Sequence, residues 1–211
     1  MELTERLARL SASQVSDGLG AAGLPRDGLL GVFPIEPARH IAGRAFTVYF
    51  RPAAEAADRK IEYIAAVSPG DVIVLGNHGR LDCSVWGGQR TVGALQRGAA
   101  ATVIDGAYRD VDEHRALGYP VFGRAPTVTG SSGYTVPVAT GETLTISGIV
   151  IRPGDYIVGD ASGVVVIPQD RAEDVTAHAE RITAEEQRIA AAVAAGADFT
   201  TFRPDTRTAR W

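Results

Sequence analysis

The residues best suited to chemistry lie in one stretch, residues 86–113, which reads W-G-G-Q-R-T-V-G-A-L-Q-R-G-A-A-A-T-V-I-D-G-A-Y-R-D-V-D-E. A glycine pair opens a helical pattern, and a short apolar run then leads to Asp105, Arg109 and Asp110. In α/β proteins, helix starts and the ends of parallel strands meet in one crevice, where ligands bind. The stretch therefore predicts a backbone anion site, a cation and a metal-binding carboxylate in one place.

Arg109 and Asp110 follow the apolar strand that the sequence predicts at 101–104. The arginine could bind a carboxylate, and the aspartate suits a hard cation, because Mg²⁺ is held by one or two carboxylates with water and substrate at its other positions. The alternative is a surface arginine beside an aspartate that caps a short helix at 111–116. The spacing alone leaves both interpretations open.

The glycine pair Gly87 and Gly88 precedes the helix predicted at 89–97. Free backbone N–H groups at a helix start, aided by the helix dipole, suit an anionic group of a substrate. A plain glycine turn is the alternative interpretation. The position of the pair, one strand before Arg109, favours the anion site.

For the other polar residues in or near this stretch, the sequence points less clearly to a functional role. Glu113 lies one helical turn from Arg109 and is expected to be an ion-pair partner rather than a direct ligand. His78 and His114 could be acid/base groups, but a histidine without a visible partner is more often solvated. Asp82 accompanies His78 on the loop expected at 76–83.

The elements around the stretch predict a single α/β domain over residues 1–211. Alternating or continuous apolar runs predict strands at 44–50, 72–75, 143–151, 156–158 and 163–167. Three-and-four spacing of apolar residues predicts a helix over 53–67, and an alanine-rich pattern predicts a long helix from 170 to about 195.

Composition narrows the function classes. The chain has 211 residues, 45% of them hydrophobic, and a formal net charge of −4. An acidic chain without a basic tract is a poor candidate for nucleic-acid binding. One cysteine excludes an internal disulfide and a cysteine-rich zinc site. No apolar segment predicts a membrane span or a signal peptide, so we expect a cytoplasmic protein that acts on a small molecule.

Several motifs together resemble the RraA-like family, which includes the class II 4-hydroxy-4-methyl-2-oxoglutarate aldolases and the regulator of ribonuclease E activity A. They are V-S-D-G-L at 15–19, the W-G-G helix start, and V-I-D-G-A-Y-R-D at 103–110. Further likeness covers A-G-R-A at 42–45, P-G-D-V at 69–72 and G-V-V before Pro168, so it spans nearly the whole chain.

The resemblance implies a compact αββα sandwich, similar to swivelling phosphohistidine domains, in a homotrimer or dimer of trimers. It implies that Arg109 binds a pyruvate unit, that Asp110 holds Mg²⁺ or Mn²⁺, and that backbone amides from Gly88, Gln89 and Arg90 hold the substrate carboxylate. The helix at about 170–195 would pack on a neighbouring subunit. Its Glu185, or else Glu186, would complete the outer shell of that neighbour's metal.

The activity implied by this resemblance is retro-aldol cleavage or decarboxylation of a 2-oxo acid. The metal and Arg109 would stabilise a pyruvate enolate. The chain departs from the aldolase pattern at Gly88, where those members usually carry an acid; Asp82 or His78 are candidates to replace it. A non-catalytic, protein-binding role like that of the ribonuclease E regulator is the alternative.

Overall fold

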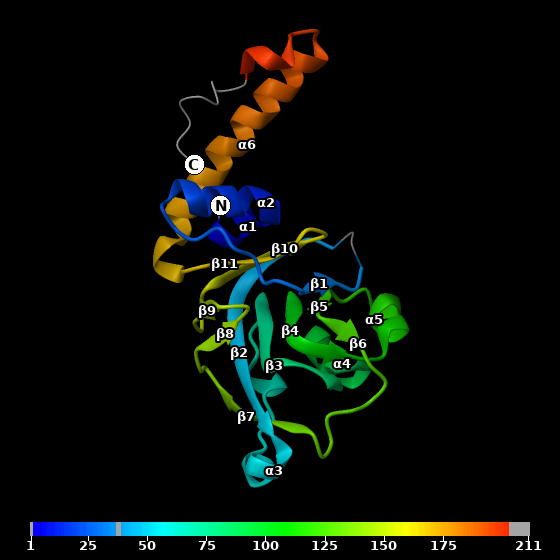
Figure 1. The fold of residues 1–211 in the computed structure, drawn as a ribbon. Helices are drawn as coiled ribbons and strands as arrows, with labels where there is room; N and C mark the ends of the chain where they lie inside the picture. The colour runs from blue at the N-terminus through cyan, green and yellow to red at the C-terminus, as the bar shows by residue number, and fades with distance from the viewer. Residues whose placement is uncertain (1, 37–38, 203–211) are drawn as a thin grey trace.

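The computed structural model describes residues 2–36 and 39–202 (Figure 1). The helical elements are α1 (Leu3–Leu7), α2 (Ala12–Ala21), α3 (Ala53–Ala56), η1 (Ala57–Arg59), η2 (Ile64–Ala66), α4 (Gly88–Gln96), α5 (Val111–Leu117), η3 (Gln169–Arg171), α6 (Ala172–Ala194) and η4 (Phe199–Phe202). The strands are β1 (Phe33–Pro34), β2 (Ile41–Pro52), β3 (Asp71–Trp86), β4 (Ala101–Tyr108), β5 (Val121–Gly123), β6 (Ala125–Pro126), β7 (Thr135–Thr140), β8 (Leu144–Ile146), β9 (Ile149–Ile151), β10 (Tyr156–Asp160) and β11 (Gly163–Ile167). None of the described helices has both the length and the hydrophobicity needed to span a bilayer.

Within the described residues, nine strands form one mixed sheet in the order β1-β5-β4-β3-β2-β10-β11, with β6 beside β4 and β7 beside β2. Strands β2 to β5 run parallel, whereas β10 is antiparallel to both β2 and β11. The N–H of Leu29 donates to the carbonyl of Val164 at 2.8 Å, which links the segment before β1 to β11. The sheet is therefore nearly closed, like a barrel, and the predicted α/β class is confirmed.

Helices cover the sheet in two groups (Figure 1). Helices α1 and α2 pack with the first part of α6 on β10 and β11, around buried Leu7, Val15 and Val175. Helix α4 lies on the other side, over a cluster that includes Trp86 and Ile104. The far part of α6 extends away from the sheet.

Two predicted elements have a different form. The helix expected over 53–67 is broken into α3, η1 and η2. Between them the chain is held to the sheet: Ile61 N–H donates to Pro137 O at 3.0 Å, and Tyr63 is fully buried edge-on to Phe50. A continuous helix would not make these contacts. The strand expected at 143–151 is the hairpin of β8 and β9, because Ser147 and Gly148 both adopt positive φ.

The prediction of a loop at 76–83 is also wrong, because these residues belong to the long strand β3. The pairing of β3 with β4 is irregular here: Gly76 pairs with Asp105, and Arg80 with the very next residue, Gly106. His78 and Gly79 adopt positive φ between these pairs. The glycines and polar residues that suggest a loop thus mark a bulged strand.

Candidate active site

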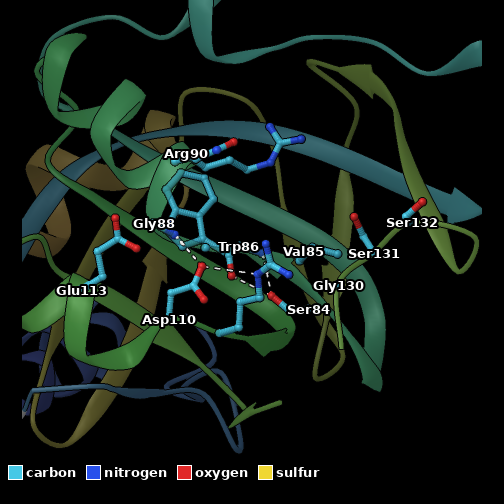
Figure 2. A pocket seen from close by; sticks show the side chains of 13 residues that line it. Ser84, Val85, Trp86, Gly88, Arg90, Asp110, Glu113, Gly130, Ser131 and Ser132 are labelled. Carbon is cyan, nitrogen blue, oxygen red and sulfur yellow. Dashed lines mark hydrogen bonds and ion pairs between the residues drawn. The ribbon is translucent and has the colours of Figure 1, made fainter. Parts of the chain in front are cut away.

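The pocket that contains the predicted site lies where β3 and β4 end (Figure 2). The two strands are parallel, so their carboxyl ends meet at one edge, and Arg109 N–H donates to Trp86 O at 3.0 Å across them. Helix α4 starts directly after β3, and α5 starts after β4. The cavity has a volume of about 550 Å³ and is lined by Ser84, Val85, Trp86, Gly87, Gly88, Gln89, Arg90, Arg109, Asp110, Glu113, Gly130, Ser131 and Ser132.

The side chain of Asp110 is held by a backbone N–H at the start of α4, not by the backbone of α5, the helix that it precedes. Its Oδ2 accepts the N–H of Gly88 at 3.0 Å and lies 3.3 Å from Nε of Arg109. It does not cap α5 with its side chain, and its backbone is left-handed, with φ 58° and ψ 41°. Such a conformation costs a non-glycine residue on the order of 1–2 kcal/mol and is tolerated best by Asp and Asn. Within the described residues Oδ1 accepts no hydrogen bond, which leaves it available to a ligand.

The guanidinium of Arg109 lies beside Asp110 at the pocket wall, and its side chain is 47% exposed. A side chain on Gly130 would bring its Cβ to 3.0 Å from Nη1 of Arg109, so glycine gives the guanidinium room. The segment that carries Gly130 is held in place by Ser84, whose N–H donates to Thr129 O at 2.8 Å. Within the described residues neither Nη1 nor Nη2 of Arg109 donates a hydrogen bond, so both remain available to an anion.

The start of α4 offers fewer free amides than the resemblance implies. Gly88 N–H donates to Asp110, and Arg90 N–H donates to Gly87 O at 3.1 Å. Of the amides of Gly88, Gln89 and Arg90, that of Gln89 alone has no acceptor in the described part of the chain, so it is the one of the three available to a substrate. The Arg90 side chain stacks on Tyr63, with its guanidinium carbon 4.7 Å from the ring centre.

A buried hydrogen-bond chain fixes the Arg109–Asp110 turn from behind. Trp86 Nε1 donates to Thr91 Oγ1 at 2.8 Å, Thr91 Oγ1 lies 2.9 Å from His114 Nδ1, and His114 Nε2 lies 2.7 Å from the Arg109 carbonyl. A carbonyl only accepts, so Nε2 carries the proton and Nδ1 accepts from the threonine. Every donor and acceptor of this chain is satisfied with a neutral imidazole.

Burial lowers the pKa of His114, although its hydrogen bond to the Arg109 carbonyl and the nearby acids oppose the shift. The side chain is 1% exposed. The prediction that this histidine is solvated is therefore wrong, because α5 packs it against α4. With both ring nitrogens occupied, His114 is a positioning residue and not an acid or base for a substrate.

The remaining predicted residues are divided between the pocket and other places. Glu113 lines the pocket and has no basic partner among the described residues, contrary to its expected ion pair. Asp82 is exposed and paired with Arg80 at 2.7 Å, which lowers its pKa. His78 donates to Phe50 O and lines a separate cavity of about 240 Å³ beside Asp105.

Glu185 and Glu186 lie on α6, and neither lines the pocket of its own chain. Glu185 accepts two hydrogen bonds from Arg188, at 2.8 and 2.6 Å, which lower its pKa. Their role toward the pocket of another copy stays a prediction.

The pocket residues fit a hard divalent cation of the Mg²⁺ type. Among the described residues no cluster of three or more His, Cys, Asp or Glu side chains is placed to bind a metal ion. The pocket instead offers the carboxylates of Asp110 and Glu113 beside open volume. One or two carboxylates with space for water and substrate is the donor set that Mg²⁺ prefers.

Known sequences resemble this chain over most of its length. The family model RraA-like, described as Aldolase/RraA, matches residues 12–166. Protein DlpA of Legionella pneumophila is 34% identical over 206 residues, which are 96% of this chain and 33% of DlpA, so the chain spans about a third of that relative. A Halalkalibacterium halodurans protein named "Putative 4-hydroxy-4-methyl-2-oxoglutarate aldolase" is 38% identical over 161 residues, 73% of this chain and 72% of that protein.

Solved structures share the fold. An uncharacterized protein of Pseudomonas syringae superposes with a TM-score of 0.87 at 36% identity, covering 94% of this chain and 95% of that one. RraAS2 of Streptomyces coelicolor, described as an unusual member of the RNase ES inhibitor RraA protein family, gives 0.80 at 27% identity, covering 88% and 94%.

Proposed function

Because the chain belongs to the RraA-like family, described as Aldolase/RraA, we propose that its Arg109–Asp110 pocket is the active site of a lyase that cleaves a 2-oxo acid with the aid of Mg²⁺ or Mn²⁺. The observation that carries the proposal is the pairing of an open guanidinium with a backbone-anchored carboxylate at the ends of two parallel strands. The aldolase name of the Halalkalibacterium relative supports the reaction class.

In this proposal Arg109 binds the anionic end of the substrate and stabilises the charge that develops as a carbon–carbon bond breaks. Retro-aldol cleavage or loss of CO₂ leaves the electron pair on the keto oxygen, as the enolate of pyruvate. Preorganised donors aimed at such a charge contribute more than donors that must reorganise. The guanidinium is already oriented by Asp110, and the free N–H of Gln89 is the second donor.

Asp110 would hold the cation through Oδ1, while its Oδ2 stays anchored to Gly88. When bound, the cation supplies Lewis-acid stabilisation of the keto oxygen. Among the described pocket residues, the carboxylates of Asp110 and Glu113 are the groups able to receive a proton, because His114 is sealed behind the turn. A water held by one of these carboxylates is therefore the proposed acceptor of the substrate's hydroxyl proton.

We further propose that the active form is a homotrimer or a dimer of trimers in which α6 packs on a neighbouring copy. Helix α6 extends beyond the body of the molecule (Figure 1), and its far part carries an apolar groove lined by Glu186, Ile189, Ala190, Val193, Ala194 and Phe199. Burial of such a groove is favourable. In this arrangement Glu185 or Glu186 would reach the neighbour's cation.

Pyruvate release tests the activity. The protein would be incubated with Mg²⁺ and either oxaloacetate or a series of 4-hydroxy-2-oxo acids, and pyruvate would be measured with lactate dehydrogenase. We expect release with at least one substrate and its loss in Asp110→Ala. Absence of pyruvate with every substrate, or release that Asp110→Ala leaves unchanged, would contradict the proposal.

A regulatory role is the second candidate, favoured by the structural likeness to RraAS2. The net charge of −4 suits contact with a basic protein partner. Capture of such a partner that is weakened by neutralising surface acids, but not by Arg109→Ala, would favour this role over the lyase.

A further inference from the structure

The pocket contains a second arginine, which has no part in the Arg109–Asp110 pair. Arg90 lies in the first turn of α4, and its side chain lines the same cavity as Arg109. Figure 2 shows its guanidinium extending away from the Glu113 carboxylate, toward the side of the pocket where Ser131 lies. Arg90 therefore places a positive charge on the side of the cavity that faces away from Glu113.

Stacking, not a close ion pair, holds Arg90 in place. Its guanidinium carbon lies 4.7 Å from the ring centre of Tyr63, which is fully buried and packs edge-on against Phe50. The closest carboxylate among the described residues is that of Glu62, with Nη1 3.9 Å from Oε1, and the Glu62 side chain is 69% exposed. This Oε1 already accepts the N–H groups of Tyr63 and Ile64, both at 3.0 Å. An exposed ion pair of this length contributes little, so the charge of Arg90 is largely uncompensated.

The part of the pocket near Arg90 suits an anionic group. Both acids that line the cavity, Asp110 and Glu113, come from the start of α5, whereas the wall at 130–132 contributes hydroxyl and backbone groups and no charge. Stacking engages the face of a guanidinium and leaves its N–H edge free to donate. The cavity of about 550 Å³ is in the size range of pockets that hold ligands much larger than a three-carbon acid. It therefore has room for a substrate whose two ends are held by Arg109 and Arg90.

We propose that Arg90 is the specificity-determining residue for the far end of the substrate: it binds an anionic group on the fragment that departs, while Arg109 binds the 2-oxo acid unit that becomes pyruvate. This inference rests on the proposed function. It narrows the substrate to 4-hydroxy-2-oxo acids that carry an anionic group beyond carbon 4.

Bond cleavage does not change the charge that Arg90 would bind. The bond between carbons 3 and 4 breaks, its electron pair stays on the pyruvate enolate, and the 4-hydroxyl loses its proton as carbon 4 becomes a carbonyl. Carbon 3 then takes up a proton to give pyruvate, and the anionic group leaves intact on the other product. Arg90 therefore binds the substrate and the transition state equally, so its removal should raise KM and leave kcat nearly unchanged.

Two substrates that differ at the far end alone test the assignment. 4-Hydroxy-2-oxoglutarate gives pyruvate and glyoxylate, whereas 4-hydroxy-2-oxopentanoate has a methyl group in place of the far carboxylate and gives pyruvate and acetaldehyde. Pyruvate release with Mg²⁺, measured by liquid chromatography, gives kcat and KM for wild type, Arg90→Gln, Arg90→Lys and Arg115→Gln. The control Arg115→Gln removes the same charge from α5, outside the pocket, where Arg115 pairs with exposed Asp112.

Loss of a hydrogen bond to a charged group weakens binding by about 10- to 100-fold. We expect Arg90→Gln to raise KM for the glutarate by this factor, with kcat within about threefold of wild type, and to change neither constant for the pentanoate by more than about threefold. Arg90→Lys should fall between wild type and Arg90→Gln, because lysine keeps the charge but loses the fork of N–H groups. Arg115→Gln should match wild type.

Equal changes of KM for both substrates in Arg90→Gln, or no change with either, would overturn the assignment. So would a wild type that cleaves the pentanoate at least as well as the glutarate. Exchange of the methyl hydrogens of pyruvate in D₂O with Mg²⁺ checks the proposed function separately, since pyruvate has no far end, and Arg90→Gln should keep the wild-type rate. Exchange by a wild type that does not cleave the glutarate would overturn the role of Arg90 alone, whereas neither exchange nor pyruvate release would overturn the proposed function as well.

Discussion

Thr91→Val is the substitution that most sharply tests how the turn is held. Valine keeps the shape of threonine but removes a hydroxyl that is fully buried and serves two partners, Trp86 Nε1 at 2.8 Å and His114 Nδ1 at 2.9 Å. Each buried polar group left without a partner costs about 1–3 kcal/mol. Two orphaned groups therefore predict a loss of about 2–6 kcal/mol in the free energy of unfolding, a large share of the roughly 5–15 kcal/mol of a typical protein.

Thr91→Ser is the matched control, because serine keeps the hydroxyl and loses only a methyl group, at a cost of about 1 kcal/mol. Urea unfolding followed by far-UV circular dichroism gives the free energy of unfolding for each variant. We expect valine to be clearly less stable than serine, by at least about 1 kcal/mol. Equal stabilities, or a more stable valine variant, would refute the hydrogen-bond chain as the device that holds this turn.

The remaining predictions concern His114, Arg109 and Gly43. Because burial lowers the pKa of His114, the unfolded state takes up the proton first as the pH falls below about 6.5. The stabilisation from the neutral ring is therefore complete above that pH, and it declines below it until the pH passes the pKa of His114 in the folded protein. Urea unfolding at several pH values should show that the free energy of unfolding declines more steeply in wild type than in His114→Gln. Arg109→Lys keeps the charge but loses the fork of N–H groups, so kcat/KM for pyruvate release should fall about 100-fold or more. Gly43→Ala should lower the free energy of unfolding by about 1–3 kcal/mol, because its Cβ would overlap the carbonyl oxygen of Gly70 on the neighbouring chain segment.

Three outcomes would contradict these predictions. Parallel pH profiles for wild type and His114→Gln would mean that the ring does not titrate with a shifted pKa. Full activity of Arg109→Lys would mean that a point charge suffices and that the fork geometry is unimportant. A Gly43→Ala protein with unchanged stability would mean that the turn carrying Gly70 moves aside at no cost.

The sequence was enough to predict that the candidate site residues meet at one edge of the sheet. An apolar run followed by Arg109 and Asp110, and a glycine pair one strand earlier, fit parallel strand ends, and the structure brings Asp110 to 3.0 Å from the N–H of Gly88. The rule that parallel strands end at one edge accounts for this success. It needs only local patterns and the order of the elements.

The contacts that depend on packing between distant segments could not be predicted. Thr91 and His114 are 23 residues apart and meet only because α4 and α5 lie side by side. The Gly130–Ser132 wall comes from a segment whose pattern of glycine and serine indicates only a loop. The carboxylate of Glu113 beside Gly88 likewise depends on the angle between two helices, which no spacing encodes.

Exchange of the methyl hydrogens of pyruvate tests the central claim most directly, because it detects enolate stabilisation whatever the natural substrate is. Pyruvate in D₂O with Mg²⁺ and the protein would be followed by proton NMR. The proposed function predicts that the methyl signal declines faster with wild type than with Mg²⁺ alone, and that Arg109→Ala and Asp110→Ala abolish the acceleration. A decline no faster than that of Mg²⁺ alone, or one that both variants retain, would contradict it.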